Sequence, residues 1–538
     1  MVWASGAALT FMLLMTATLL VVIVSNGLGV FWPSPLAEVT LADGSKLLGR
    51  QIMTRTNPDN DVRSVKFKTA NREFDSQRQD FHWLTDDKIV KVEFPAAAMV
   101  LERLENGDCY GFLKGLETPT LEAPTEADLL KRFAAAVRAQ RRQEAEIIEP
   151  LAAQLAPLSD QLQQIDAAID VLRYRQSRAL AAAGQGTADD AEAKLQALQA
   201  RKTEVNGQSQ KLKAQQQEKE AALRRNVAVL ADGQGQPHRV VLADIVRYYQ
   251  PNDMGLPAKV GHYLAKIWEL LTAGPREANT EGGLFPAIFG TVLLIFLMAL
   301  SCFPLGVLAG VYLGEYARDG ILVRLVRIAV NNLAGIPSIV YGIFGLGFFV
   351  YGIGAMLDRW FFPERVAAGN PTFGTGGILW ASLTLGLLTV PVVIVATEEA
   401  IRAIPRGIRE SSYALGATKF QTLLRVLVPL ASPGIMTGFI LAMARAAGEV
   451  APLMITGVVK IAPAMPLDAK YPFVHLERKF MHLGYHIYDI GFQSPNVEAT
   501  KPMVYVTTLL LVLIVLLMSS LAIYLRNRMR KRLNLRMM

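Results

Sequence analysis

Six long runs without a charged residue constrain this chain more than any other feature of its sequence. They cover residues 1–37, 282–314, 328–357, 366–397, 426–444 and 502–525. An apolar helix of about 20 residues crosses the hydrocarbon core of a bilayer, and every run is close to that length or longer. Glycine and proline are tolerated inside such helices, because neighbouring helices satisfy the freed backbone groups. The runs predict an α-helical membrane protein with six transmembrane helices.

The basic end of the chain predicts how these helices are oriented. Residues 526–538, RNRMRKRLNLRMM, carry six Lys or Arg and no acid directly after the last run, so the positive-inside rule places them in the cytoplasm. Six crossings return the N-terminus to the cytoplasm and place residues 33–281 outside. A cleaved signal peptide is the alternative for the first run, although that run lacks a basic start. We assign the net charge of +8 to inward-facing flanks and expect no nucleic-acid binding.

The expected outer segment combines two patterns. Leucine and isoleucine recur at spacings of four and three over residues 151–172, and residues 195–223 continue the repeat with polar interruptions, which is typical of a coiled-coil seam. Glycines at 184 and 186 separate the halves, so we expect an antiparallel helical hairpin. Strand-like pieces with (Asp/Asn)-Gly turns flank it and predict a small β domain. No spacing here suits metal ligands or a nucleophile, and we expect a spacer or docking arm.

The loop between the fourth and fifth runs carries the most specific motif. It reads Glu410-Ser411-Ser412, three residues, Gly416, nine residues, and then Val-Leu-Val before Pro429. A glycine can adopt the positive φ that separates two short amphipathic helices, and such a pair can dock in a groove of a partner. The loop resembles the signature of bacterial ABC importer permeases, E-A-A, three residues, Gly, nine residues, I-x-L-P. Serine replaces alanine twice, and valine replaces isoleucine and leucine. The resemblance implies docking on an ATPase subunit.

Further segments narrow the resemblance. NNLAGIPSIVYGIFG (331–345), GIMTGFILAMARAAGEVAPLMITG (434–457) and HLGYHIYDIGFQSPN (482–496) are similar to the A-type permease subunits of phosphate-specific ABC importers. This implies a bacterial inner-membrane subunit of an ATP-driven phosphate importer. It also implies three partners: a second permease subunit, an ATPase dimer that uses ATP and Mg, and a periplasmic phosphate-binding protein. The sequence has no GK dipeptide and therefore no phosphate loop of its own, so we expect no enzyme activity and no cofactor in this chain.

Two other functions stay open. A membrane-anchored structural or regulatory protein could use the external coiled coil to reach a partner, with the transmembrane helices as its anchor. An ABC permease of the same mechanism could carry another oxyanion, such as sulfate or molybdate. The signature loop and a pair of charges within the fifth run favour the transporter, because an anchor requires neither.

The predicted architecture is the six-helix ABC importer permease type with an external insertion. It comprises a first transmembrane helix (1–32), a β-rich segment (33–125), a coiled-coil hairpin (126–226), return strands and a linker (227–281), five further transmembrane helices that include a coupling loop at 398–429 (282–525), and a basic cytoplasmic tail (526–538).

Arg445 and Glu449 lie four residues apart inside apolar sequence. A charge at bilayer depth costs about 3 kcal/mol or more, so such residues usually face a bundle interior or a water-filled path. With Arg first, the order is the weaker one for an intrahelical pair, and we expect each to have a further partner elsewhere. A guanidinium fits phosphate oxygens, and the carboxylate could hold and release it. Anion contact or gating, a structural ion-pair lock, and placement near a helix end all remain open.

Weaker candidates are Ser338 and three histidines. Ser338 follows a proline at a possible helix break, where it either presents backbone N–H groups to an anion or starts an ordinary helix. We expect His475, His482 and His486 to be packing residues, and we expect no metal site.

Overall fold

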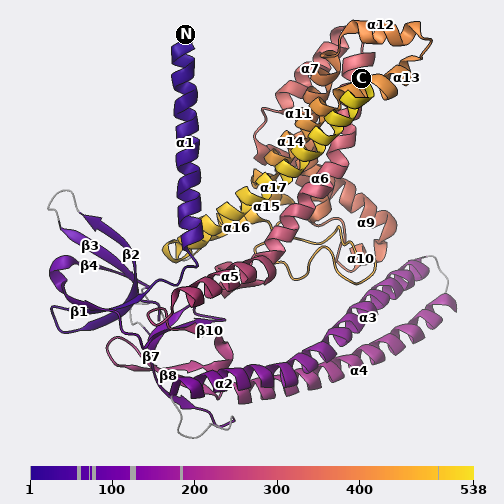
Figure 1. Cartoon of the computed structure of the whole chain (residues 1–538). Helices are drawn as coiled ribbons and strands as arrows, with labels where there is room; N and C mark the ends of the chain where they lie inside the picture. The colour runs from indigo at the N-terminus through magenta and orange to yellow at the C-terminus, as the bar shows by residue number, and fades with distance from the viewer. Residues whose placement is uncertain are drawn as a thin grey trace.

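The computed structural model describes residues 2–56, 62–71, 73–74, 80–120, 129–181, 186–494 and 496–537. Within them, six helical stretches are long and apolar enough to cross a membrane, which confirms the predicted number. They are Trp3–Gly29, Phe285–Tyr316, Ser338–Phe361, Ile378–Arg402, Lys419–Gly448 and Val497–Arg528. The last five form one bundle, and helix α1 stands beside it (Figure 1).

The bundle is built from helices and short helical turns. Their bounds are α1 Val2–Gly29, α6 Phe285–Val311, η5 Tyr312–Tyr316, α7 Ile321–Leu333, α8 Ser338–Phe344, η6 Gly345–Gly354, α9 Ala355–Phe361, α10 Pro363–Ala367, α11 Ile378–Arg402, α12 Arg406–Ala414, α13 Lys419–Thr422, η7 Leu423–Leu427, α14 Val428–Gly448, α15 Ala451–Thr456, α16 Leu483–Tyr488, η8 Asp489–Gln493 and α17 Val497–Met537. The basic residues after 525 therefore continue the last helix.

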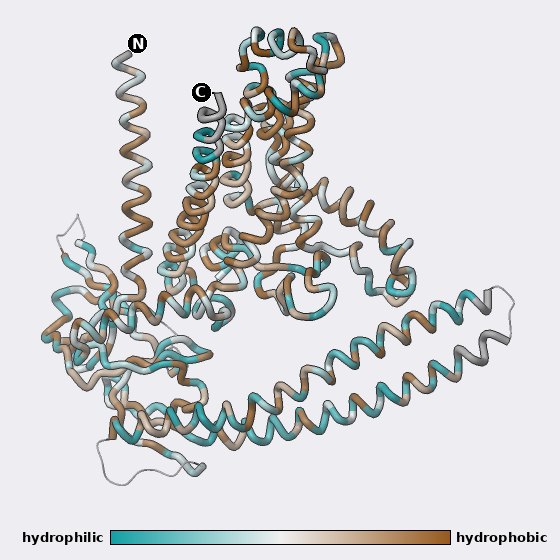
Figure 2. Tube along the Cα trace, turned by 45° about the vertical axis from the view of Figure 1, so that its right-hand side comes forward, coloured by the Kyte–Doolittle hydropathy of each residue, from teal (hydrophilic) through white to brown (hydrophobic). Residues whose placement is uncertain are grey.

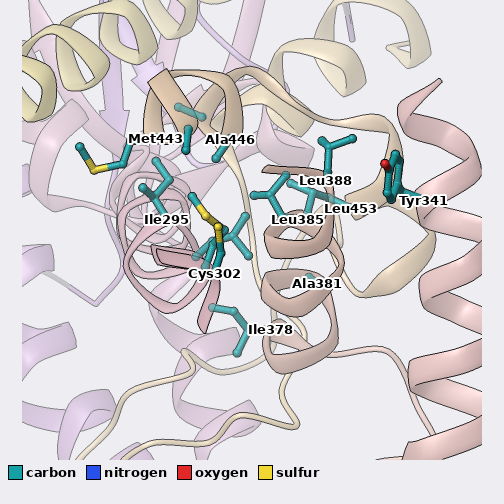
Figure 3. Packing of buried hydrophobic residues seen from close by; sticks show 14 of the residues in the cluster. Ile295, Cys302, Tyr341, Ile378, Ala381, Leu385, Leu388, Met443, Ala446 and Leu453 are labelled. Atoms are coloured by element: carbon teal, nitrogen blue, oxygen red, sulfur yellow. The ribbon is translucent and has the colours of Figure 1, made fainter. Parts of the chain in front are cut away.

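Helix α11 forms the centre of the bundle, where it packs against α6 and α14. Apolar side chains from all three, with Tyr341 of α8 and Leu453 of α15, fill one core (Figure 3). Small residues allow the close approach: a Cβ on Gly310 of α6 would lie 2.6 Å from the carbonyl oxygen of Ile394. Close backbone packing of this kind is typical of membrane helices, which gain no hydrophobic stabilisation by leaving lipid.

The insertion between α1 and α6 contains two antiparallel five-stranded sheets, with strand orders β4-β3-β2-β1-β5 and β10-β6-β7-β8-β9. The strands are β1 Leu36–Leu41, β2 Lys46–Thr56, β3 Arg63–Lys68, β4 Phe81–Thr85, β5 Ile89–Glu93, β6 Ala98–Arg103, β7 Cys109–Glu117, β8 Val227–Ala231, β9 Pro237–Val241 and β10 Ile245–Tyr249, with short turns η1 Asp86–Lys88 and η3 Leu242–Asp244. Because β7 pairs with β8, the helical hairpin leaves and re-enters the second sheet between neighbouring strands.

The expected turns are partly as predicted. Gly44 has a φ of +80°, and Asn106 and Gly107 both have positive φ, which suits the tight hairpins expected there. At a third Asp-Gly pair, Asp232-Gly233, the prediction of a tight turn was wrong in detail. The left-handed residue is Gly235 rather than Gly233, because the Asp232 carboxylate accepts from the backbone N–H groups of residues 234 and 236 and widens the turn.

The arm, which we define as α2 Leu129–Gln143, η2 Glu144–Ile148, α3 Glu149–Ala181 and α4 Gly186–Leu223, is a long helical hairpin. The predicted start at residue 126 lies outside the described residues. Ile169, Val205 and Leu223 are buried in the contact between α3 and α4, on the predicted seam. The π-helical turn η2 comes directly before Pro150, where a distortion was expected, since proline cannot continue regular helical hydrogen bonding.

The arm does not project into solvent along its whole length. Helix α3 packs against α10 of the bundle, and the Asp160 carboxylate lies 2.6 Å from the Lys470 ammonium. In Figure 1 the arm accordingly runs beneath the end of the bundle that faces the insertion.

The expectation of a simple linker before the second span was wrong. Residues 256–272 form helix α5, Leu256–Thr272, and a short hairpin of β11 Pro275–Arg276, η4 Glu277–Asn279 and β12 Glu281–Gly282 joins it to α6. A Cβ on Gly283 would lie 2.2 Å from the carbonyl oxygen of Ala273, so only glycine allows this reversal. Helix α5 lies across the foot of α6 (Figure 1).

Buried charges hold α5 to the β domain. We call Glu102, Arg247, Lys266, Glu269 and Arg276 the junction network. Glu102 of β6 is 4% exposed and lies 2.7 Å from Lys266 of α5, while Glu269 of α5 lies 2.7 Å from Arg276 and 3.1 Å from Arg247 of β10. The network ties two strands, α5 and the connection to α6 into one unit.

The insertion also contacts the start of the last span. Lys66 of β3, which is 7% exposed, pairs with Glu498 in the first turn of α17, and the side-chain amide of Asn496 donates to Asp80 at 2.7 Å.

Candidate coupling and translocation site

The predicted signature loop forms a compact knob, which we define as residues 406–427. Helices α12 and α13 flank Gly416, whose φ of +82° places it in the left-handed region that favours glycine. Thr418 and Gln421 form a reciprocal capping box at the start of α13. The hydroxyls of Ser412 and Thr422 lie 2.8 Å apart and join the two helices. The knob lies at the end of the bundle opposite the insertion (Figure 1).

An arginine that the sequence analysis did not single out braces this knob. The Arg409 guanidinium lies 2.9 Å from the Glu315 carboxylate in η5 and donates to the carbonyls of Ile404 and Ile401 at 2.6 and 2.7 Å. Because η5 continues α6 and Ile401 belongs to α11, one side chain fixes the knob to two membrane helices. The separation of 94 residues between Glu315 and Arg409 gave no sequence signal for this contact.

The outer surface of the knob is apolar and open. Leu415 is 90% exposed and Phe420 is 62% exposed, and Leu424 is also exposed. Of the predicted coupling residues, Glu410 and Ser411 are exposed, Ser412 is half-buried, and Pro429 lies half-buried in the first turn of α14. Exposed apolar side chains on a rigid turn are typical of a protein-docking surface.

One continuous helical element leads from the knob to Arg445. The π-helical turn η7 leads directly into α14, which runs to Gly448. Pro429 and Arg445 are 16 residues apart on it, or about 24 Å at 1.5 Å per residue. The knob and the charge pair therefore cannot touch, but they lie near opposite ends of one rigid rod.

Arg445 and Glu449 pair with each other, with 3.5 Å between Nε and Oε1. Within the described residues, neither side chain has a second ion pair or a hydrogen bond, and the further partners expected from the sequence stay a prediction. Because α14 ends at Gly448, Glu449 has extended backbone, with φ −83° and ψ 126°, and can turn toward Arg445. Both side chains are partly exposed, at 30% and 21%, which leaves the two terminal nitrogens of Arg445 available.

The sequence matches known transporters over this part of the molecule. The family model of the binding-protein-dependent transport system inner membrane component matches residues 303–531. A Bacillus subtilis protein described as the probable ABC transporter permease YqgI is 31% identical over 239 residues, which cover 43% of this chain and 74% of that protein. The chain belongs to the family of ABC transporter permeases.

Relatives named PstA extend the match. The phosphate transport system permease protein PstA of Yersinia pestis is 34% identical over 262 residues, which cover 49% of this chain and 77% of that protein. PstA 1 of Mycobacterium tuberculosis is 36% identical over 188 residues, but the match covers only 55% of its length and 35% of this chain. The chain is thus a PstA-type permease, a transporter component rather than an enzyme.

The break between α7 and α8 packs beside the break between α14 and α15. Helix α7 ends at Leu333 and α8 begins at Ser338, as the proline before Ser338 suggested. A Cβ on Gly342 of α8 would lie 2.8 Å from the Cα of Pro452, so α8 and α15 are in close contact just after the Arg445–Glu449 pair. The structure brings the two breaks into one region, but records no contact between Ser338 and the charge pair.

A cavity of about 230 Å³ lies nearer the knob, lined in part by Arg327, Asn331, Glu398 and Arg402. The Glu398 side chain is only 13% exposed, and it pairs with Arg327 at 2.8 Å and with Arg402 at 3.1 Å. Arg327 also lies 3.1 Å from the Asp319 carboxylate, and its pair with Glu398 joins α7 to α11.

The three histidines of the permease lie among packed side chains. The His486 ring bonds the Asn279 carbonyl at 2.9 Å and Thr507 at 3.2 Å, and His482 accepts from the Gly484 N–H at 3.1 Å. Burial lowers the pKa of both to about 4. Among the described residues, no group of three or more His, Cys, Asp or Glu is placed to hold a metal ion.

Proposed function

We propose that this chain is a membrane-spanning permease subunit of an ATP-driven importer of inorganic phosphate. The observation that carries the proposal is its match over 77% of the Yersinia pestis phosphate permease, beside a family match over residues 303–531, which include the knob and the Arg445–Glu449 pair. In this proposal the knob residues Glu410, Ser411, Ser412, Gly416 and Pro429 dock on, or support docking to, a separate ATPase dimer, which binds ATP and Mg.

The proposed path passes Arg445. Its two terminal nitrogens lack partners within the described residues, and a guanidinium can offer them as a fork to phosphate oxygens. Before the anion binds, the Glu449 carboxylate balances the charge of Arg445. The anion then displaces Glu449 when it binds. Because Glu449 lies at the joint between α14 and α15, a movement of α14 driven at the knob changes the distance between the pair. Ser338, on the neighbouring break, is a further residue assigned to this path.

The remaining partners follow from the same proposal. A periplasmic phosphate-binding protein delivers the anion, and a second permease subunit, either a copy or a paralogue, completes the path. The chain lies in the bacterial inner membrane with both termini in the cytoplasm and residues 33–281 in the periplasm. The opposite placement of knob and insertion supports this orientation, since one end must meet the ATPase.

Phosphate uptake by vesicles that contain the assembled transporter tests the proposal. We expect uptake that excess phosphate competes away and excess sulfate does not. Uptake inhibited equally by sulfate or molybdate would assign another oxyanion. A complete lack of anion uptake by the intact assembly would instead favour the anchoring protein considered from the sequence.

Replacing Arg445 tests the path in the same vesicles. A charge-assisted hydrogen bond contributes about 1.5–3 kcal/mol, so Arg445→Ala should weaken apparent phosphate affinity about 10- to 100-fold, and Arg445→Lys should restore part of it. Arg359→Ala is the matched control, because that guanidinium bonds the Ala355 carbonyl of its own helix at 3.2 Å. Unchanged affinity in correctly assembled Arg445→Ala would leave the pair a structural lock.

A further inference from the structure

Helix α5 has the reverse of the polarity that a water-exposed helix requires. Its exposed residues include Leu256, Val260, Leu264, Trp268 and Leu271, which recur at intervals of four and three. Trp268 is 69% exposed and Leu264 is 59% exposed. In water, a surface helix turns such residues inward and its charges outward.

The charged side chains of α5 instead face the protein. Lys266 reaches buried Glu102, and Glu269 lies between Arg247 and Arg276. His262 lies on the same side, 4.0 Å from Glu102, and burial together with Arg247 lowers its pKa to about 4, so this ring is neutral near pH 7. Lys266, Glu269 and His262 are thus directed at the β domain and its connection to α6, while the face that carries Leu264 and Trp268 is apolar.

The connections of α5 fix its level relative to the membrane helices. Near the middle of α5, the ring of Tyr263 lies 6.0 Å from the ring of Trp32, three residues after α1. At the C-terminal end of α5, the backbone N–H groups of Leu284 and Phe285 donate to the carbonyls of Leu270 and Ala273, at 2.8 and 3.2 Å. Helix α5 is therefore held at the height where one span ends and the next begins.

We propose that α5 lies in the membrane interface, with the apolar face defined by Leu256, Val260, Leu264, Trp268 and Leu271 in contact with lipid. The β domain covers the polar face, so the apolar face points toward the bilayer. Helix α6, which follows it in the chain, likewise exposes apolar side chains, among them Phe285, Phe296 and Leu300. A 17-residue helix that contains Lys and Glu does not span a membrane, but it suits the boundary of headgroups and acyl chains. Trp268 then sits where tryptophan is enriched.

The consequence is a support for the insertion. The junction network fixes the β domain to α5, and lipid contact fixes α5 to the plane of the membrane. Helix α5, together with the two chain connections, then holds the insertion and the arm at a fixed height relative to the bundle. The spans are drawn mainly in the brown of hydrophobic residues, whereas the arm carries much teal (Figure 2).

Nitroxide accessibility measures the environment of this face in the full-length chain, assembled with its partners in lipid nanodiscs. Leu264→Cys carries the label. Glu204→Cys, on the arm, is the water-exposed control, and Leu305→Cys, 63% exposed on α6, is the control within a span. The unsubstituted chain gives the labelling background, since its cysteines Cys109 and Cys302 are buried. Val260→Cys repeats the measurement one turn away.

We expect labels at 264 and 260 to collide freely with oxygen and to be shielded from a water-soluble nickel complex, as at 305. Access of the nickel complex equal to that at 204 would overturn the proposal in favour of water. Shielding from both reagents would also overturn it, and would show that a protein surface covers α5.

Discussion

The membrane bundle and the insertion satisfy their buried polar groups in opposite ways. In the bundle, the buried polar residues are largely threonines that bond their own helix: the Thr384 hydroxyl donates to the Trp380 carbonyl at 2.7 Å, one turn back. In the insertion, they include full charges whose partners are far along the chain. Glu102 and Lys266 are 164 residues apart, and Arg103 donates to Glu73 at 2.9 Å.

This difference sets what each region tolerates. A hydroxyl that returns to its own helix can be removed without stranding a partner, so the bundle depends mainly on close packing. A buried charge that loses its partner strands another charge, and the cost then exceeds the strength of the original pair. The predictions below test this contrast, from the largest expected effect to the smallest.

The largest effect is expected at Glu102. Glu102→Ala removes the nearest carboxylate of Lys266 and leaves Lys266 and Arg247 with Glu269 alone, at 3.6 and 3.1 Å, and should lower the free energy of unfolding of the insertion by about 3 kcal/mol. Resistance of the full-length chain to proteolysis in increasing urea measures this. The control is Glu38→Ala, whose partner Lys46 is 48% exposed and whose loss should cost about 1 kcal/mol or less. Equal effects of the two substitutions would remove the distinction between the regions.

An effect of similar size concerns pH. Burial, and then the neighbouring Asp108 carboxylate, raises the pKa of Glu281 to about 7, from an ordinary value of 4.5. The folded chain therefore holds this proton more tightly, so the contribution of Glu281 to stability is present below pH 4.5 and is lost as the pH rises to about 7. Glu281→Gln, which keeps the neutral shape, should remove a loss on the order of 3 kcal/mol. Thermal unfolding midpoints between pH 4.5 and 8 measure it, and an unchanged profile in the variant would contradict the assignment.

The smallest effect is expected in the bundle. Thr384→Val keeps the shape of the side chain against Gly345 and removes only a hydroxyl bonded within α11, so stability should fall by about 0.6 kcal/mol. The unfolding midpoint of the chain in detergent measures this change. A loss as large as that at Glu102 would contradict the assignment of the Thr384 hydroxyl to a bond within its own helix.

The same contrast explains what the sequence could predict. The six spans and the knob could be predicted because hydropathy and motif spacing are local properties of the chain. The Arg409–Glu315 brace and the junction network were not, since each joins residues that look like ordinary surface charges until the fold brings them together. Apolar residues spaced four apart, at Leu256, Val260, Leu264 and Trp268, are a local signal for α5 that the prediction of a linker did not use.

The Arg445–Glu449 pair shows another feature that the sequence could not predict. The position of Arg445 within apolar sequence indicated a special residue, but the end of α14 at Gly448 could not be inferred from residues that read as continuous helix. That break, and not helical spacing, lets Glu449 reach back to Arg445.

The central claim is that the knob transmits ATP-driven movement to the spans. Phosphate taken up per ATP hydrolysed, measured in vesicles of the assembled transporter, tests it with two glycines. Neither Gly416 nor Gly407 has an atom that an added Cβ would meet within 4 Å, but only Gly416 has a positive φ. Alanine in the left-handed region costs about 1–2 kcal/mol, or roughly tenfold in an equilibrium. Gly416→Ala should therefore lower uptake per ATP about tenfold, while Gly407→Ala should match the wild type. Wild-type coupling in both variants would contradict the account.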